Sequence, residues 1–205
     1  NSKNLKNTIN KNKVVFYVAY NHRFEPHFIR MKNLIDSKVL GKIYSCRMFY
    51  GNGTAKLVKR SRWRDKKKGI ITDIGSHLID TCLFFFGNRI RNFKLISKRK
   101  FENKSPDHVI LLSDNSNPKI ELEMSYLMWK NDFFCDILAK KGSAHLSTLC
   151  KWGPSKFTYR QRKLPSGKPK EKKTILVSND LTWLEEYKHF KNLIKKKKKN
   201  NFSKD

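Results

Sequence analysis

The chain has 205 residues, and 46 lysine and arginine residues against 17 aspartate and glutamate residues give it a formal net charge of +29 at pH 7. This length suits one domain, or one domain with a fragment of another. Because 38% of the residues are hydrophobic and 12% are aromatic, spread along the whole chain, we expect a hydrophobic core. A core excludes the collagen-like, coiled-coil and intrinsically disordered classes.

Membrane and disulfide-linked classes are also disfavoured. No apolar run approaches the roughly 18 to 20 residues that span a bilayer, and the polar start, residues 1–12, has no signal-peptide core. We therefore expect a cytoplasmic protein with no membrane partner. The cysteines are far apart and form no C-x-x-C pair, so they are predicted to be small core residues. They are Cys46, Cys82, Cys135 and Cys150.

The charge of +29 is typical of proteins that bind phosphate groups, so nucleic-acid binding is one hypothesis. Lysine outnumbers arginine, however, and is scattered along the chain, which favours a solvated surface over a recognition face and makes a nucleic-acid partner unlikely. The one block of like charge is Lys195–Lys199, and residues 197–205 are expected to form a basic polar tail.

The chain begins with a predicted helix end over residues 4–10 and a predicted buried strand, Val14–Ala19, which leads into a polar loop. A helix is expected to begin at Glu25-Pro26 and to end at Leu40-Gly41, because apolar residues recur at helical spacing between them. The next strand is predicted at Lys42–Tyr50.

A polar, basic and glycine-containing stretch over residues 51–68 is predicted to be an irregular loop. A second helix then follows Asp73, with apolar residues on one face and Gly87 as its C-terminal stop.

After Gly87 the pattern changes to short β-like runs separated by turn signals. Several antiparallel strands after two helices predict an α+β domain, in which an open, mainly antiparallel β-sheet has helices packed on one face. A last helix is expected from about Asp180, with its largely aromatic stripe packed on the sheet. The stripe consists of Trp183, Tyr187, Phe190 and Ile194.

The short β-like runs after Gly87 are Phe93–Ser97, His108–Ser113, Lys119–Met128, Phe133–Ala139, Ala144–Leu149, Lys156–Tyr159 and Thr174–Val177.

The segment TDIGSHLID, Thr72–Asp80, holds the sharpest polar constellation in the chain. His77 lies one helical turn after Asp73, so a carboxylate and an imidazole converge beside the positive end of a helix dipole. Such a pair can bind a substrate hydroxyl and move its proton near neutral pH. Alternatively, Asp73 only caps the helix and His77 packs in the core, and the spacing alone leaves both interpretations open.

Two other motifs do not meet the requirements of the sites they suggest. GNGTAK, Gly51–Lys56, begins like a dinucleotide fingerprint but lacks the third glycine and the apolar helix that should follow, so a flexible loop is predicted. His22 and His27 lie on either side of Glu25 without metal-site spacing, so no metal is predicted.

The loop before Asp73 carries three arginines around an indole: Arg60, Arg62, Trp63 and Arg64. Guanidinium groups beside a tryptophan suit a phosphate or a planar ring. A solvated basic loop with Trp63 tucked into the core explains the segment equally well.

Three longer segments resemble the second half of the Gfo/Idh/MocA oxidoreductases, the glucose-fructose oxidoreductase and inositol dehydrogenase family. They are VAYNHRFEPHF (Val18–Phe28), KNLIDSKVLGKIYSCRMFYGNGTA (Lys32–Ala55) and WRDKKKGIITDIGSHLIDTCLFFFG (Trp63–Gly87), in the order and spacing of the family. The resemblance continues more loosely to Ile194. It implies an N-terminal Rossmann domain that holds NAD or NADP, and a C-terminal α+β domain whose open sheet forms the substrate site and often the oligomer interface.

The resemblance also implies domain boundaries. Residues 1–22 are expected to be the end of a Rossmann domain, a helix tail and the last strand, and residues 23–196 the C-terminal substrate-binding domain. The resemblance also implies two kinds of partner: a sugar or sugar-nucleotide substrate, and further copies of the chain bound through the sheet.

Site residues follow from the family motifs one at a time. His77 matches the histidine of the D-x-x-x-H pair and is expected to give or take the substrate proton, while Asp73 orients the substrate or the imidazole. Asn21 and Arg23 match the N-x-R motif and are expected near the cofactor and the substrate.

Four further residues are expected to contact ligands. Trp63 and Arg64 match a loop that in relatives reaches the cofactor or the substrate. Lys151 and Trp152 resemble a sugar-binding stretch of some members.

Two features depart from the family pattern. The dinucleotide fingerprint and the E-K-P motif, whose lysine is a catalytic candidate, do not occur in this sequence, and the glycine pair before the D-x-x-x-H motif is reduced to Gly69. We therefore expect the substrate-binding half of an NAD(P)-dependent oxidoreductase that acts on a sugar, sugar nucleotide or cyclitol, and expect it to bind NAD(P) poorly alone. The alternatives are a truncated, non-catalytic family member that acts as a dimerisation or interaction module, and a basic nucleic-acid-binding protein.

Overall fold

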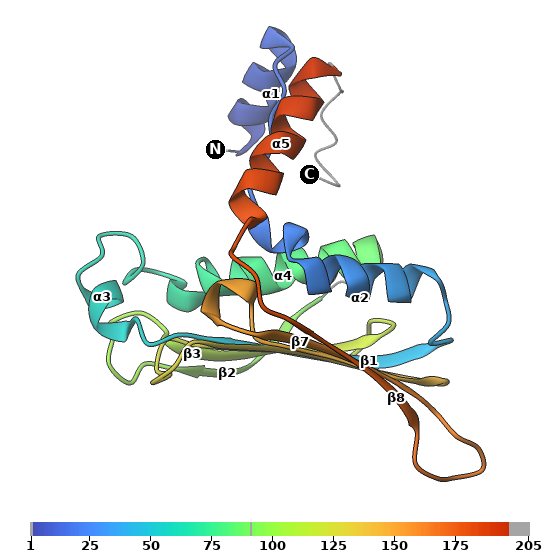
Figure 1. Ribbon diagram of the computed structural model, residues 1–205. Helices are drawn as coiled ribbons and strands as arrows, with labels where there is room; N and C mark the ends of the chain where they lie inside the picture. Colours follow the sequence, from blue (N-terminus) through green and yellow to red (C-terminus); the bar gives the residue numbers. More distant parts are fainter. Residues whose placement is uncertain (1, 91, 197–205) are drawn as a thin grey trace.

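The computed structural model describes residues 2–90 and 92–196, so the predicted tail over 197–205 lies outside the described residues. Its centre is one eight-stranded sheet with the strand order β2-β3-β4-β1-β5-β6-β7-β8. Strands β1 and β4 pair in parallel, and every other pair in this sheet is antiparallel. Helices α2 and α4 lie on one face of the sheet (Figure 1). The predicted α+β class, with an open and mainly antiparallel sheet, is confirmed.

The strands and helices have the following bounds. The strands are β1 (Ile43–Gly51), β2 (Lys94–Arg99), β3 (His108–Ser113), β4 (Lys119–Ser125), β5 (Asp132–Ala139), β6 (Gly142–Ser147), β7 (Ser155–Gln161) and β8 (Lys170–Leu176). The α-helices are α1 (Ser2–Asn12), α2 (Pro26–Asp36), α3 (Ala55–Lys59), α4 (Ile74–Phe86) and α5 (Thr182–Lys195). The 3-10 helices are η1 (Asn21–Phe24), η2 (Gly69–Ile71), η3 (Gly87–Arg89) and η4 (Cys150–Trp152).

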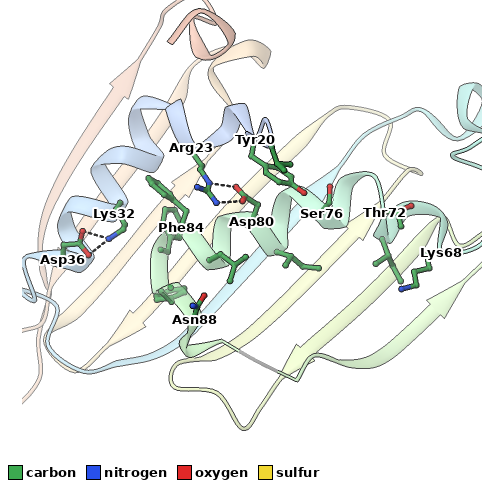
Figure 2. Close-up of a pocket in the computed structure, with 17 residues that line it drawn as sticks. Tyr20, Arg23, Lys32, Asp36, Lys68, Thr72, Ser76, Asp80, Phe84 and Asn88 are labelled. Carbon is green, nitrogen blue, oxygen red and sulfur yellow. Dashed lines mark hydrogen bonds and ion pairs between the residues drawn. The ribbon is translucent and has the colours of Figure 1, made fainter. Parts of the chain in front are cut away.

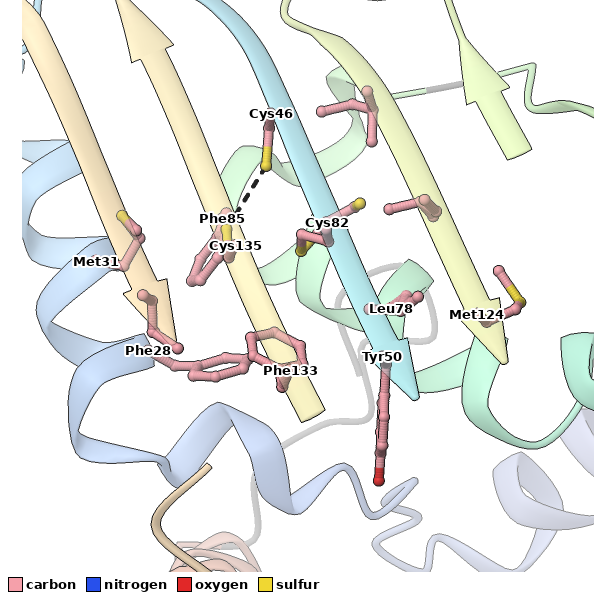
Figure 3. Close-up of a cluster of buried hydrophobic side chains, with 14 of the residues drawn as sticks. Phe28, Met31, Cys46, Tyr50, Leu78, Cys82, Phe85, Met124, Phe133 and Cys135 are labelled. Atoms are coloured by element: carbon pink, nitrogen blue, oxygen red, sulfur yellow. Dashed lines mark hydrogen bonds between the residues drawn. The ribbon is translucent and has the colours of Figure 1, made fainter. Parts of the chain in front are cut away.

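The core lies between the helix layer and the sheet. Strand side chains alternate between this core and the other face, so Phe133 and Cys135 of β5 are fully buried. Phe133 packs against Phe28 of α2, which in turn packs against Phe85 of α4 (Figure 3). All four cysteines are buried free thiols, which confirms their prediction as core residues.

The first two helices of the prediction are present, with one boundary moved. Pro26 opens α2 at its first turn, and Gly87 ends α4 with a left-handed φ of +63°, as predicted. Helix α2, however, ends at Asp36 rather than near Gly41, because Lys38 adopts a left-handed φ of +57° that a helix cannot contain.

The predicted strand Val14–Ala19 is wrong. In the described residues this segment is assigned to no helix or strand and lies outside the eight-stranded sheet. Its contacts are with α5 instead: the Tyr17 hydroxyl donates a hydrogen bond to Glu186 at 3.2 Å, and its ring lies 6.0 Å from that of Phe190. A β-branched run predicts an extended backbone, but only a neighbouring strand makes it part of a sheet.

The predicted packing of α5 on the sheet is also wrong. Together with α1, α5 projects from the helix layer on the side away from the sheet (Figure 1). Its stripe contacts Tyr17 through Phe190, while Trp183 and Tyr187 remain 63% and 59% exposed. The buried residues of α5 are Thr182 and Glu186, so most of the predicted stripe is not covered in this structure. A helical period carries no information about which surface covers an apolar face.

Two smaller expectations also need correction. The loop over 51–68 contains one short helix, α3, because Ala55 and Val58 find buried positions on the same side of it. The stretch Gly69–Phe86 is also long and apolar enough on average to cross a membrane, contrary to the expectation that no such run exists. Helix α4, which makes up most of this stretch, has eight buried residues and serves as a core helix.

Candidate functional site

Polar side chains from several segments of the chain meet at one end of the sheet. Because β1 and β4 are parallel, their C-terminal ends lie at the same edge. Tyr50 is the next-to-last residue of β1, and Tyr126 directly follows β4. The N-terminal part of α4 brings Asp73 and His77 to this edge through contacts with these tyrosines, which lie far from it in sequence. Residues that are far apart in the sequence, and that share no motif, therefore come together at this edge of the sheet.

Asp73 precedes α4, but its side chain makes no capping hydrogen bond. Instead, its carboxylate accepts a hydrogen bond of 2.8 Å from the Tyr126 hydroxyl and forms an ion pair with Arg64, with Nε and Oδ2 3.3 Å apart. The capping interpretation is therefore wrong for this side chain. The carboxylate is held at the site by a hydroxyl and a guanidinium group, and burial together with this carboxylate raises the pKa of Tyr126.

His77 lies one turn further along α4, surrounded by rings. Its imidazole lies 4.5 Å from that of His22 and 5.5 Å from the ring of Tyr20, and its Nδ1 is buried without a hydrogen-bond partner. Burial lowers the pKa of His77, and the positive charge of Lys151 lowers it further, while Asp73 opposes the shift. A neutral imidazole is the form that can accept a proton, so His77 is suited to act as a general base.

Lys151 and Trp152 form the next wall of the site. The Lys151 ammonium lies 4.9 Å from the centre of the Trp152 ring and donates a hydrogen bond of 3.5 Å to the Tyr50 hydroxyl. Burial lowers the pKa of Lys151 and raises that of Tyr50. The loop that carries Lys151 is fixed by the buried Glu25, whose carboxylate accepts a hydrogen bond of 3.2 Å from the Cys150 amide.

Asn21 and Arg23 make structural contacts. Asn21 is buried and donates a hydrogen bond of 2.8 Å to the Thr182 hydroxyl, which ties η1 to the start of α5. Arg23 binds Asp80 of α4 through two hydrogen bonds, of 2.9 and 2.6 Å. Both side chains thus hold helices in place around the site.

Arg23 and Asp80 also line a hollow of about 1020 Å³ on the outer side of α4, together with Tyr20, Ser76 and Phe84 (Figure 2). Neither Asp73 nor His77 lines it. Tyr20 connects the two places, because its ring also contacts that of His77 edge-on. The hollow is therefore a neighbour of the site and not the place where Asp73 and His77 meet a ligand.

In the loop before Asp73 that carries the three arginines, one side chain reaches the site and a neighbouring one is exposed to solvent. Arg64 reaches Asp73, and its guanidinium lies 5.2 Å from the Trp63 ring. Trp63 is 58% exposed, so the interpretation that it packs in the core is wrong. An exposed indole beside a guanidinium is a surface on which a flat ring or a phosphate can bind.

Sequence reasoning missed four residues of this site: His22, Glu25, Tyr50 and Tyr126. The sequence does place both tyrosines at the ends of buried strands, where polar side chains can reach a site. It does not show that β1 and β4 are neighbours, so it could not show that the two tyrosines belong to one site. Among the described residues, no group of three or more histidine, cysteine, aspartate or glutamate side chains is arranged to hold a metal ion.

The buried histidines predict how stability depends on pH. Burial lowers the pKa values of His22, His27 and His77 below the ordinary value of 6.5, so below that pH the unfolded chain binds more protons than the folded chain. Stability should therefore fall as the pH drops from about 7.5 to about 5.5, measured as the urea midpoint.

Comparison of the wild type with His22→Phe isolates the contribution of the His22 imidazole to this loss of stability at low pH. The buried Glu25 and Glu186, whose pKa values burial raises, titrate in the opposite sense and are common to both proteins. We expect a smaller loss of stability in the variant over the same pH range. Equal losses in both proteins would contradict the assignment.

Comparison with known proteins gives four findings. A family model described as the GFO/IDH/MocA C-terminal domain matches residues 28–145. The chain is 26% identical over 145 residues to glucose-6-phosphate 3-dehydrogenase of Bacillus subtilis, covering 68% of this chain and 39% of that protein. It is 31% identical over 86 residues to scyllo-inositol 2-dehydrogenase (NADP(+)) of the same organism, covering 40% of this chain and 24% of that protein. Levoglucosan dehydrogenase in complex with NADH has the same fold, with a TM-score of 0.74 at 18% identity over 98% of this chain and 62% of that one.

The chain thus spans less than half the length of these two Bacillus subtilis proteins, and less than two thirds of levoglucosan dehydrogenase. The match to levoglucosan dehydrogenase shows a shared fold and, at 18% identity, nothing more specific.

Proposed function

Because the chain belongs to the GFO/IDH/MocA family, whose C-terminal-domain model matches residues 28–145, we propose that it is the substrate-binding and catalytic half of an NAD(P)-dependent oxidoreductase. Its substrate is a sugar, sugar nucleotide or cyclitol. The names of the two relatives, a glucose-6-phosphate 3-dehydrogenase and a scyllo-inositol 2-dehydrogenase, support a polyhydroxylated substrate. The observation that carries the proposal is the half-buried His77, which lies one helical turn from the Asp73 carboxylate and whose pKa burial lowers.

His77 moves the substrate proton in this proposal. In the oxidising direction, the carbinol carbon loses a hydride and its hydroxyl loses a proton, so that the carbon becomes a carbonyl. NAD(P)+, when bound, accepts the hydride. Since Nδ1 of His77 is buried, the proton goes to Nε2, and in the reducing direction it returns from Nε2 to the oxygen.

Lys151 and Tyr50 stabilise the charge that develops on the substrate oxygen. The Lys151 ammonium and the Tyr50 hydroxyl lie together on the Trp152 side of the site, within 3.5 Å of each other. Donors that are already fixed in place stabilise an oxyanion without reorganisation. Trp152 offers a ring face for the apolar side of a sugar.

Asp73 and Arg64 orient the substrate in this proposal, since they form an ion pair and Asp73 also accepts a hydrogen bond from Tyr126. Trp63, on the exposed side of Arg64, is available to the cofactor or to the nucleotide part of a substrate. Asn21 and Arg23 contribute indirectly, by fixing η1 against α5 and α4, next to the cofactor and the substrate.

The dinucleotide itself requires a further domain. In the loop that resembles a fingerprint, a Cβ at Gly53 would lie 2.5 Å from the Met128 carbonyl oxygen, so this glycine permits close backbone packing and does not cradle a phosphate. We propose that a Rossmann domain, to which residues 1–22 belong, supplies the NAD or NADP site. The exposed Trp183 and Tyr187 of α5 are the surface on which it packs.

Two further parts of the proposal concern assembly and location. The face of the sheet that α2 and α4 leave uncovered carries Leu138 and Ile175, which are 55% and 52% exposed, and we place a homo-oligomer contact there. A cytoplasmic location is proposed because nicotinamide cofactors are available there.

The complete reading frame that contains this chain, together with the intact mass of the native protein, tests the proposal. We expect a strand, a G-x-G-x-x-G turn and an E-K-P motif upstream, and reduction of NAD+ or NADP+ when the purified protein is given a panel of sugars and cyclitols. A native protein that begins near Asn1 and shows no turnover would instead support the interaction-module alternative.

A further inference from the structure

His22 is a buried histidine that lacks every expected hydrogen bond. It is 1% exposed, and both of its ring nitrogens are buried without a partner among the described residues. Buried polar side chains nearly always have a partner, and leaving one unpaired destabilises a protein. A side chain that costs stability in this way calls for a functional explanation.

The contacts of His22 point to His77. The centres of the two imidazoles lie 4.5 Å apart and their planes are tilted by 31°, so the rings pack against each other, and no hydrogen bond joins them. On its other sides, His22 is enclosed by aromatic rings at 5.5 to 6.4 Å. These rings belong to Phe28, Tyr50 and Phe133. These three rings hold the His22 ring in place, and its remaining side contacts the His77 ring.

Charges around the pair determine which of the two rings takes a proton. Burial lowers the pKa of His22 well below its ordinary value, and Lys151 lowers it further, so His22 stays neutral. The groups that face His77 are Lys151 from η4, the Tyr50 hydroxyl from β1, and Asp73 and Asp80 from its own helical segment. The carboxylates of Asp73 and Asp80 favour protonation of His77, whereas the groups that act on His22 among the described residues all disfavour its protonation.

We propose that His22 is a positioning residue for His77. Its neutral ring packs on the face of the His77 imidazole, keeps Nε2 directed to the substrate, and stabilises the protonated form of His77 by a cation–π contact. The inference rests on the proposed function in one respect, namely that His77 carries the substrate proton.

The test compares two replacements of similar size. His22→Phe keeps an aromatic face and removes the two unpartnered nitrogens, whereas His22→Leu keeps the apolar volume and removes the face. The titration of the His77 ring is followed by NMR in each variant of this chain. We expect His22→Phe to titrate like the wild type. In His22→Leu the ratio of protonated to neutral His77 should fall about threefold to tenfold at a given pH, the factor that one desolvated cation–π contact supplies.

His27→Leu is the matched control. His27 is also a buried imidazole, packed 5.8 Å from the ring of Phe157, but it contacts the Ser155 carbonyl and not His77. It should leave the His77 titration unchanged. If His22→Leu does not fold, His22→Met provides an apolar side chain of similar volume without a ring.

Identical His77 titrations in wild type, His22→Phe and His22→Leu would overturn the inference. This readout needs neither cofactor nor turnover, so it is independent of the proposed function. The variant His77→Asn tests that function separately, because it should lose hydride transfer. If this variant keeps hydride transfer, the catalytic role of His77 is refuted, and the titration still reports on the contact between the two rings.

Discussion

Replacing His77 by asparagine is expected to lower the rate of hydride transfer by about 100-fold to 10,000-fold in the complete enzyme, the range that a positioned general acid or base contributes. Asparagine is polar and of similar size, but it cannot accept the substrate proton. The change therefore removes proton transfer and leaves the contacts of the His77 backbone, including the hydrogen bond from Thr81 at 2.8 Å, in place.

The measurement is the pH dependence of kcat and kcat/KM in both proteins. Because burial lowers the pKa of His77, the neutral base form persists below the ordinary histidine value, and wild-type oxidation should decline only at more acidic pH. The variant should lose this inflection along with the rate. A variant that retains both the rate and the inflection would show that another group carries the proton.

His145→Asn is the matched control for this substitution. His145 is a half-buried histidine of β6 that binds Asp136 at 2.7 Å and Ser143 at 2.8 Å, away from the site. Its replacement also removes one imidazole and two hydrogen bonds, but no residue of the Asp73 and His77 site. It should therefore leave the pH profile unchanged.

The substitution Asp80→Ala should reduce the free energy of unfolding by about 3 to 5 kcal/mol, as expected when one partner of a buried ion pair is removed. The Asp80 side chain is 6% exposed, and that of Arg23 is 22% exposed. Removing the carboxylate leaves the guanidinium beside Phe84 in a largely apolar place. The pair joins η1 to α4, so its loss also loosens the support of His22 and His77.

Urea unfolding measures this effect, with Asp36→Ala as the control. Asp36 pairs with Lys32 on the surface of α2, and its side chain is 57% exposed, so its loss should cost less than about 1 kcal/mol. The double variant Arg23→Met with Asp80→Leu should recover most of the lost stability, because no unpaired charge remains. If Asp80→Ala and Asp36→Ala shift the urea midpoint equally, the Arg23–Asp80 pair does not stabilise the fold as a buried ion pair.

Much of the fold was predictable from local pattern. Turn and cap residues marked the ends of α2 and α4, as Pro26 and Gly87 show. Alternating burial marked strands such as β3 and β5, where every second side chain faces the core. These features depend on residues within a few positions of each other, so periodicity is sufficient to find them.

The site was predictable only in part. The spacing of Asp73 and His77 left a capping and a catalytic interpretation open, and the family resemblance favoured the second. The contact that decides against the cap is the hydrogen bond from Tyr126, which is 53 residues away in the chain. The sequence around His22 suggests at most a metal ligand, because its neighbour in the fold, His77, belongs to a different motif.

By itself, then, the sequence of this protein determined the type and order of most helices and strands, the inward faces of α2 and the central strands, and the family to which the chain belongs. Only the tertiary structure decided that β1 and β4 are parallel neighbours, that Val14–Ala19 joins no strand, and that α5 stands away from the sheet. The physical reason is the same in each case. Local periodicity states which face of an element is apolar, whereas the partner that covers that face depends on how distant segments pack together.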